Sequence, residues 1–163
     1  MDAESLDEEL GRFTDDVGLF YEELGLPRIW GRVLGWLLVC HPDLQTADDL
    51  AAALHASKGS ISMATQALIR YGMAERQALR GARRTYYRIH PGAWTFVLEQ
   101  QKQNTAKLRE LGERGLKLLN SEPSERRRRL EELNDLATFS EREVATMLER
   151  WREQHQDATG KPD

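Results

Sequence analysis

The first 26 residues carry apolar side chains at the spacing of an amphipathic α-helix. They are Leu6, Leu10, Phe13, Val17, Phe20 and Leu24. Intervals of three or four positions place them on one face of a helix over about residues 2–24. The next segment, residues 28–40, is apolar on nearly every side and predicts a buried helix that ends at His41-Pro42.

A helix-turn-helix is predicted in the middle of the chain. Thr46 has the character of an N-cap, with Asp49 three positions later as in a capping box, and it opens a short helix to about Leu54. Ser57 is the N-cap expected for a second helix, which Gly72 ends. Two short helices joined by a tight turn are the outline of a helix-turn-helix.

The pattern then changes from helical to strand-like periodicity. Residues 73–79 and 85–90 predict two strands, the second rich in aromatic and β-branched side chains, with Gly81 in the turn between them. A helix-turn-helix that is followed directly by a basic hairpin has the order of elements of a winged helix. Residues 27–91 are therefore predicted to form a winged helix-turn-helix DNA-binding domain with a two-stranded β wing.

Residues 92–157 return to helical periodicity, with a break near residues 120–123, after which Ser124 is a suitable N-cap. Together with residues 1–26, these helices carry more apolar surface than a winged helix of this size needs. We therefore expect both segments to form a helical dimerisation region. The polar end, residues 158–163, is predicted to be a flexible tail. The expected fold class is mainly α.

The distribution of charge favours nucleic-acid binding, although the chain is acidic overall. Its 163 residues carry a formal net charge of −4. Residues 1–26 hold nine acidic side chains and one Arg, whereas residues 57–90 hold one Lys and six Arg against Glu75 alone. The segment that is predicted to bind DNA is thus strongly basic, and the acidic first helix should be turned away from DNA.

Other function classes lack their signatures in this sequence. It has no nucleophile with a base partner, no phosphate-binding glycine motif and no metal-ligand spacing, so we expect neither an enzyme nor a bound metal or cofactor. Cys40 is the single cysteine, and its place at the end of an apolar run favours a core residue over a redox sensor. That run is too short to span a membrane and the N-terminus is acidic, unlike a signal peptide, so we expect a cytoplasmic protein without a membrane partner.

The second helix of the helix-turn-helix has a polar face that suits the major groove. This face begins with small side chains and then offers hydroxyl, amide and guanidinium groups, which can bind base edges. The helix N-terminus favours a phosphate, and arginines at the tip of the wing suit the minor groove. The predicted DNA contacts are Lys58, Gly59, Ser60, Ser62, Met63, Gln66 and Arg70 of the helix and Arg80, Arg83 and Arg84 of the wing. Arg76 and Arg88, further along the strands, would contact phosphates if they face DNA.

These features leave three hypotheses open. The first is a transcriptional repressor that responds to a ligand. The second is a winged-helix protein that binds double-stranded DNA without any effector. The third is a helical protein-interaction module whose basic hairpin binds an acidic partner.

Three segments resemble the MarR family of bacterial transcriptional regulators, in particular its GbsR-like branch and the mycobacterial MarR-type repressors of lipid-exporting efflux pumps. They are Gly31-Arg32-Val33-Leu34-Gly35-Trp36-Leu37-Leu38-Val39-Cys40, the segment from Leu50 to Ile69 with Ser-x-Gly-x-Ile-Ser at 57–62, and Arg83-Arg84-Thr85-Tyr86-Tyr87. The likeness covers almost the whole chain and is most specific in its middle half. The sequence departs from the family's pattern in the N- and C-terminal helices.

The resemblance implies a homodimer that binds a near-palindromic operator, with half-sites about 10 bp apart. Family members usually repress a neighbouring gene, often a transporter or efflux gene. They release DNA when a small hydrophobic or amphipathic molecule binds where the dimer helices meet the winged helix. Aromatic and aliphatic side chains with one charge suit such an effector. The candidate effector-binding residues are Phe13, Phe20, Trp30, Leu34, Trp94, Val97 and Arg109.

Overall fold

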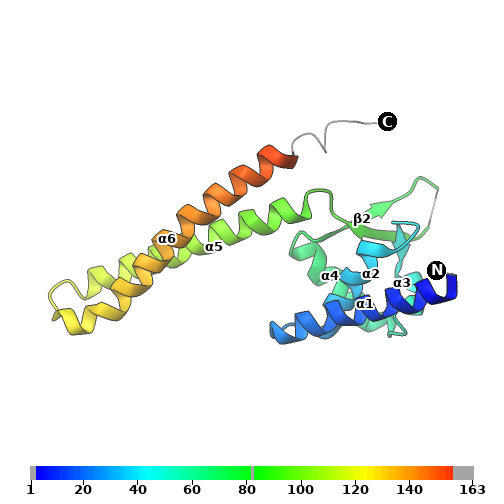
Figure 1. Ribbon diagram of the computed structural model, residues 1–163, viewed down its shortest axis with the longest axis horizontal. Coiled ribbons are helices and arrows are strands. Elements are labelled where there is room, and N and C mark those ends of the chain that lie inside the picture. Colours follow the sequence, from blue (N-terminus) through cyan, green and yellow to red (C-terminus); the bar gives the residue numbers. More distant parts are fainter. Residues whose placement is uncertain (1–2, 82, 156–163) are drawn as a thin grey trace. The chain divides into compact units, whose positions relative to one another are not determined.

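A computed structural model of the chain describes residues 3–81 and 83–155, and within these it contains six helices and three short strands (Figure 1). The chain divides into two compact units, the first ending at Ala93 and the second beginning at Trp94. The first helix therefore belongs to the same unit as the winged helix. The expected role of residues 1–26 in dimerisation stays a prediction, and the predicted tail over residues 158–163 lies outside the described residues.

Helix α1 (Ala3–Glu23) packs closely against α2 (Arg28–Val39), which confirms the two helices expected at the start of the chain. Glycines on α2 allow the close approach: a Cβ atom on Gly31 would lie 2.4 Å from the backbone oxygen of Val17. An ion pair adds to this contact, with Asp15 Oδ1 2.7 Å from Arg32 Nε. Helix α2 supplies buried side chains to the core, as its uniformly apolar sequence predicts.

The predicted helix-turn-helix is confirmed as α3 (Ala47–Ala53) and α4 (Lys58–Arg70). Both predicted N-caps are present, because the Thr46 hydroxyl accepts from the Asp49 amide and the Ser57 hydroxyl accepts from the Ser60 amide. Gly72 follows α4 with a φ of +65°, the left-handed conformation expected after a helix end. The core beneath these helices is apolar and includes Val33, Leu34, Leu37, Leu50, Leu54, Ile61 and Leu68.

A three-stranded antiparallel sheet completes this unit, with strand order β1-β3-β2. Strands β2 (Ala74–Ala78) and β3 (Thr85–Ile89) form the predicted wing, with Ala78 opposite Thr85 at its outer end. Strand β1 (Gln45–Thr46) pairs with β3 and was not predicted, because two residues are too few to show any periodicity. It joins the base of the wing to the N-cap of α3.

The second unit is a helical hairpin of α5 (Ala93–Leu118) and α6 (Ser124–His155), which confirms the break expected between two long helices. Figure 1 shows the two helices running alongside each other. Polar contacts tie them together at widely separated positions: Arg109 Nε lies 2.7 Å from Glu141 Oε2, and Trp151 Nε1 donates to Thr95 Oγ1 at 3.0 Å. Side chains that face the other helix, such as Val144 and Leu148, are buried.

Many charged side chains lie on the surface of α5 and α6 and form ion pairs there. The four consecutive arginines at 126–129 begin α6, and Arg126, Arg127 and Arg128 form ion pairs with Glu122, Glu131 and Glu132. Each pair links residues four positions apart in the same chain, so the charge of these arginines is balanced locally. None of the helices in the described ranges combines the length and the apolar character that crossing a membrane requires.

Candidate nucleic-acid interface

Helix α4 is divided into a buried and an exposed face as the helical wheel predicts. Ile61, Ala64, Thr65 and Leu68 are buried in the core. The opposite face is exposed and presents Gly59, Ser62, Met63, Gln66 and Arg70. Met63 is 63% exposed, which is unusual for a large apolar side chain and leaves its thioether free to contact a ligand of this face.

Hydrogen bonds orient two of the polar groups on α4. Gln66 Nε2 donates to Ser62 Oγ over 3.2 Å. The amide of Gln66 then has one N–H and its carbonyl oxygen left, which is the donor and acceptor pair that binds the edge of adenine. At the helix N-terminus, Ser57 and Ser60 are joined through their hydroxyls at 2.9 Å.

The wing places its arginines in the loop that joins β2 to β3. Arg80, Arg83 and Arg84 are all exposed there, and Gly81 makes the turn with a φ of +85°. Arg88, unlike these three arginines, binds a residue within the sheet: its Nε donates to Glu75 Oε1 on the paired strand at 2.7 Å. We therefore assign Arg88 to stabilising the wing, while Arg76 on β2 is exposed.

An ion pair lies at the start of the exposed face of α4. Lys58 Nζ is 2.7 Å from Asp48 Oδ1 of α3. The hydrogen bond from this ammonium is the main reason that the pKa of the Asp48 carboxyl is lowered. Sequence reasoning assigned Lys58 to phosphate contact and missed this carboxylate, although its position in the first turn of α3 is a common one for an acidic residue.

The predicted effector-binding residues fall into the two units. Phe13 and Phe20 are exposed on α1, whereas the ring of Trp30 lies 5.8 Å from that of Tyr71. Leu34 is only 3% exposed and packs in the core, so a ligand would reach it only by displacing core side chains.

The remaining three candidates are on α5. Trp94 and Val97 are exposed there. The guanidinium of Arg109 binds both Glu141 and Glu113, and these two hydrogen bonds raise its pKa. Its charge is thus already compensated within the hairpin, which weakens the case for Arg109 as the charged group that meets an effector.

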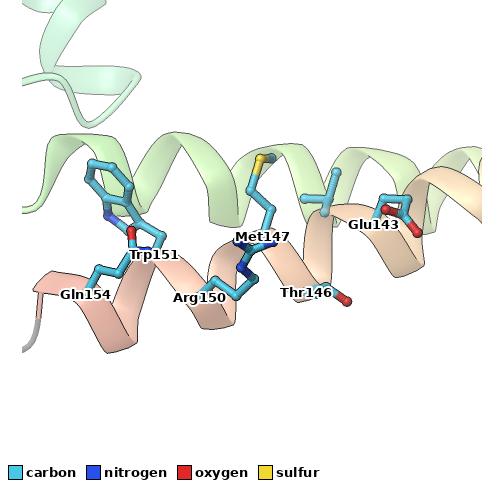
Figure 2. Close-up of a pocket in the computed structure, with 7 residues that line it drawn as sticks. Glu143, Thr146, Met147, Arg150, Trp151 and Gln154 are labelled. Atoms are coloured by element: carbon cyan, nitrogen blue, oxygen red, sulfur yellow. The ribbon is translucent and has the colours of Figure 1, made fainter.

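A shallow groove of about 450 Å³ lies on α6 and includes none of the seven candidates. Figure 2 shows its residues, among which Met147 and Trp151 extend toward α5. Trp151 also stacks on His155 with ring centroids 3.7 Å apart. The four-position spacing of Met147 and Trp151 is the signal in the sequence that places both side chains on one face of α6.

Cys40 is partly buried at the edge of the core, and its assignment as a core residue stays a prediction. It packs against the core of the first unit, and burial raises the pKa of its thiol. A raised pKa keeps the side chain in its unreactive thiol form at neutral pH.

Comparison with known proteins gives a family assignment. Residues 92–154, which span α5 and α6, match the family described as MmpR5-like MarR family transcriptional regulators. The chain is 37% identical over 163 residues to the HTH-type transcriptional regulator MmpR5 of Mycobacterium tuberculosis, covering 100% of this chain and 96% of that protein. A crystal structure of a transcriptional regulator superimposes with a TM-score of 0.78 and 39% identity, over 89% of this chain and 99% of the other.

These likenesses extend through both units, so they are not limited to the helix-turn-helix. They are to transcriptional regulators, and they agree with the winged-helix fold described above. The chain belongs to the MarR family of transcriptional regulators.

Proposed function

We propose that this protein is a homodimeric repressor that binds a near-palindromic operator, with α4 of each subunit in the major groove of one half-site. The observation that carries this proposal is the exposed polar face of α4 in the same unit as an arginine-rich wing. A helix with this surface fits the groove, and the exposed arginines beyond β2 suit the minor groove.

Each group on this surface has a distinct role in the proposal. Gly59 permits close approach of the backbone, and Met63 meets a thymine methyl group. Gln66 binds adenine and Arg70 binds guanine or a phosphate. Lys58 and Ser60 bind phosphate at the helix N-terminus. The wing residues Arg80, Arg83 and Arg84 bind in the minor groove or to its phosphates.

Repression of an adjacent transporter or efflux gene in the cytoplasm, and release by a small hydrophobic or amphipathic effector, complete the proposal. Large apolar side chains that are exposed on α1 and α5, such as Phe20 and Trp94, support an apolar ligand or subunit contact. An effector causes release only if it favours a dimer in which the two recognition helices no longer match the half-site spacing.

The central test is binding to the DNA immediately upstream of the protein's own gene. The affinity of the wild-type protein should fall steeply with salt and exceed its affinity for random duplex of equal length. The double variant R83A/R84A should lose affinity at least tenfold, with a shallower salt dependence, because two arginines no longer contact DNA.

The variant R128A/R129A is the matched control, since it removes two adjacent arginines from α6 and should bind like the wild type. Equal affinity of the wild-type protein for upstream and random DNA would contradict the proposal. If R83A/R84A bound as tightly as the wild type, the wing would have no part in binding.

A further inference from the structure

A carboxylate lies against one of the predicted phosphate-binding groups. Asp48, on the first turn of α3, forms an ion pair of 2.7 Å with Lys58, the first residue of α4. The side chain of Asp48 is 55% exposed and that of Lys58 is 77% exposed. The pair is therefore open to solvent, and a DNA phosphate can approach the same ammonium.

The carboxylate of Asp48 differs in its contacts from that of the adjacent Asp49. Asp49 Oδ2 accepts from the Thr46 amide at 2.8 Å and from its hydroxyl at 2.7 Å, so this carboxylate closes the capping box of α3. Asp48 is not used in that cap and turns to Lys58 instead. Its ion pair is thus with a residue of the proposed DNA-binding surface.

Arg84 of the wing also interacts electrostatically with the carboxylates of Asp48 and Asp49. The positive charge of Arg84 contributes to the lowered pKa of both Asp48 and Asp49, after the larger effects of Lys58 on the first and Thr46 on the second. Arg84 therefore lies within electrostatic reach of the start of α3. A single carboxylate, Asp48, thus attracts two of the cations that the proposed function assigns to phosphate.

We propose that Asp48 is an intramolecular competitor of DNA phosphate for Lys58, an inference that rests on the proposed function. The ammonium must give up its contact with the carboxylate, or share its charge, when it binds phosphate, and the carboxylate repels the phosphate itself. Contacts to phosphate carry no sequence information. Asp48 therefore lowers the affinity for operator and for random DNA by the same factor and favours release of both.

The test compares D48N with the wild-type protein on an upstream duplex and on a random duplex of equal length, across a salt series. The variant should bind both duplexes about 1.5-fold to fivefold more tightly, the range expected when an exposed ion pair no longer occupies one cation. The slope of log Kd against log salt should increase by about one, the value for one additional phosphate contact, because Lys58 is now free to displace a counterion.

Two controls separate this effect from a general change in charge. D43N makes the same change of one unit at an exposed residue in the loop before β1 and should leave both affinities unchanged. In a K58Q background, D48N should tighten binding by a clearly smaller factor, because only the repulsion of phosphate and the attraction of Arg84 are then removed. An equal gain from D43N, or a gain of undiminished size with K58Q, would overturn the role of Asp48.

Whether D48N strengthens or weakens DNA binding decides the inference. If D48N weakened binding, or left it unaltered while the wild-type protein bound DNA normally, Asp48 would not compete with phosphate and the inference would fail alone. Failure of the wild-type protein to bind either duplex would overturn the proposed function, and this inference would fall with it. A thermal melt of D48N that matches the wild type confirms that the folded proteins are being compared.

Discussion

At the scale of single residues, the hydrogen bond from Gln66 to Ser62 bears on sequence recognition. It fixes one N–H of this exposed amide on its own helix, over 3.2 Å, and leaves the other N–H and the oxygen for a further partner. A side chain held in this way loses less rotamer freedom when it binds a base. In the proposed complex, Ser62 is therefore a positioning residue for Gln66 in addition to its own predicted DNA contact.

We expect Q66A to relax the preference at one base pair of each half-site by about 1–3 kcal/mol, the discrimination of a bidentate contact. S62A should relax the same base pair more weakly, since Gln66 is still present but less well oriented. Competition binding with operators that carry single base-pair changes measures both effects. Q103A, an exposed glutamine on α5, should leave the pattern intact. Relaxation at different base pairs in Q66A and S62A would show that Ser62 acts independently.

Residue types on the exposed surface could be predicted from the sequence, but their mutual contacts could not. The helical wheel places Ser62, Gln66 and Arg70 outward because the period of an α-helix is fixed. It does not show that Lys58 meets Asp48, because that contact depends on the angle between α3 and α4. Glu75 and Arg88 are similar, since strand register decides that these two residues face each other.

At the scale of the elements, the contact of α1 with α2 depends on the absence of a side chain at Gly31. The Cβ of an alanine there would lie 2.4 Å from the Val17 oxygen and 2.9 Å from the Gly18 Cα, both of them backbone atoms. Backbone atoms in a helix cannot rotate away as a side chain can. The two helices must therefore separate, and side chains around the contact lose their packing.

G31A is accordingly expected to lower the free energy of unfolding by about 1–3 kcal/mol, the usual cost of forcing extra volume into a packed contact. G11A is the matched control, because a Cβ there meets nothing within 4 Å. That change should raise stability by about 0.5–1 kcal/mol through better helix propensity. Urea unfolding followed by circular dichroism measures both. A neutral result for G31A would mean that α1 is held less closely to α2 than the structure shows.

Most elements could be predicted because their ends carry strong local signals. Thr46 and Ser57 each begin a helix by satisfying free amides, and Gly72 tolerates the left-handed conformation that follows one. Strand β1 has no such signal, since it exists only through its pairing with β3. The position of α1 in the first unit also lay beyond prediction, because an amphipathic stripe does not say what covers it.

At the scale of the whole molecule, apolar side chains on α6 remain without cover in the single chain. Leu136 is 60% exposed and Phe139 is 63% exposed, although the opposite side of the helix is buried against α5. Apolar side chains that are close together on one helix are normally covered by another protein surface. A second copy of the chain is the cover that the proposed homodimer supplies.

The variant F139E should therefore be monomeric at micromolar concentration, where light scattering should show the wild-type protein as a dimer. A carboxylate in that contact would be desolvated without a partner, which strongly opposes association. Binding to a two-half-site operator should weaken by about a hundredfold or more, because the two half-sites no longer act together. Binding to an isolated half-site should stay as weak as that of the wild type. R129Q changes the charge by the same amount at an exposed residue ten positions before Phe139 on α6 and should remain a dimer. A dimeric F139E with full operator affinity would place the subunit contact on another surface, of which the exposed stripe of α1 is the next to test.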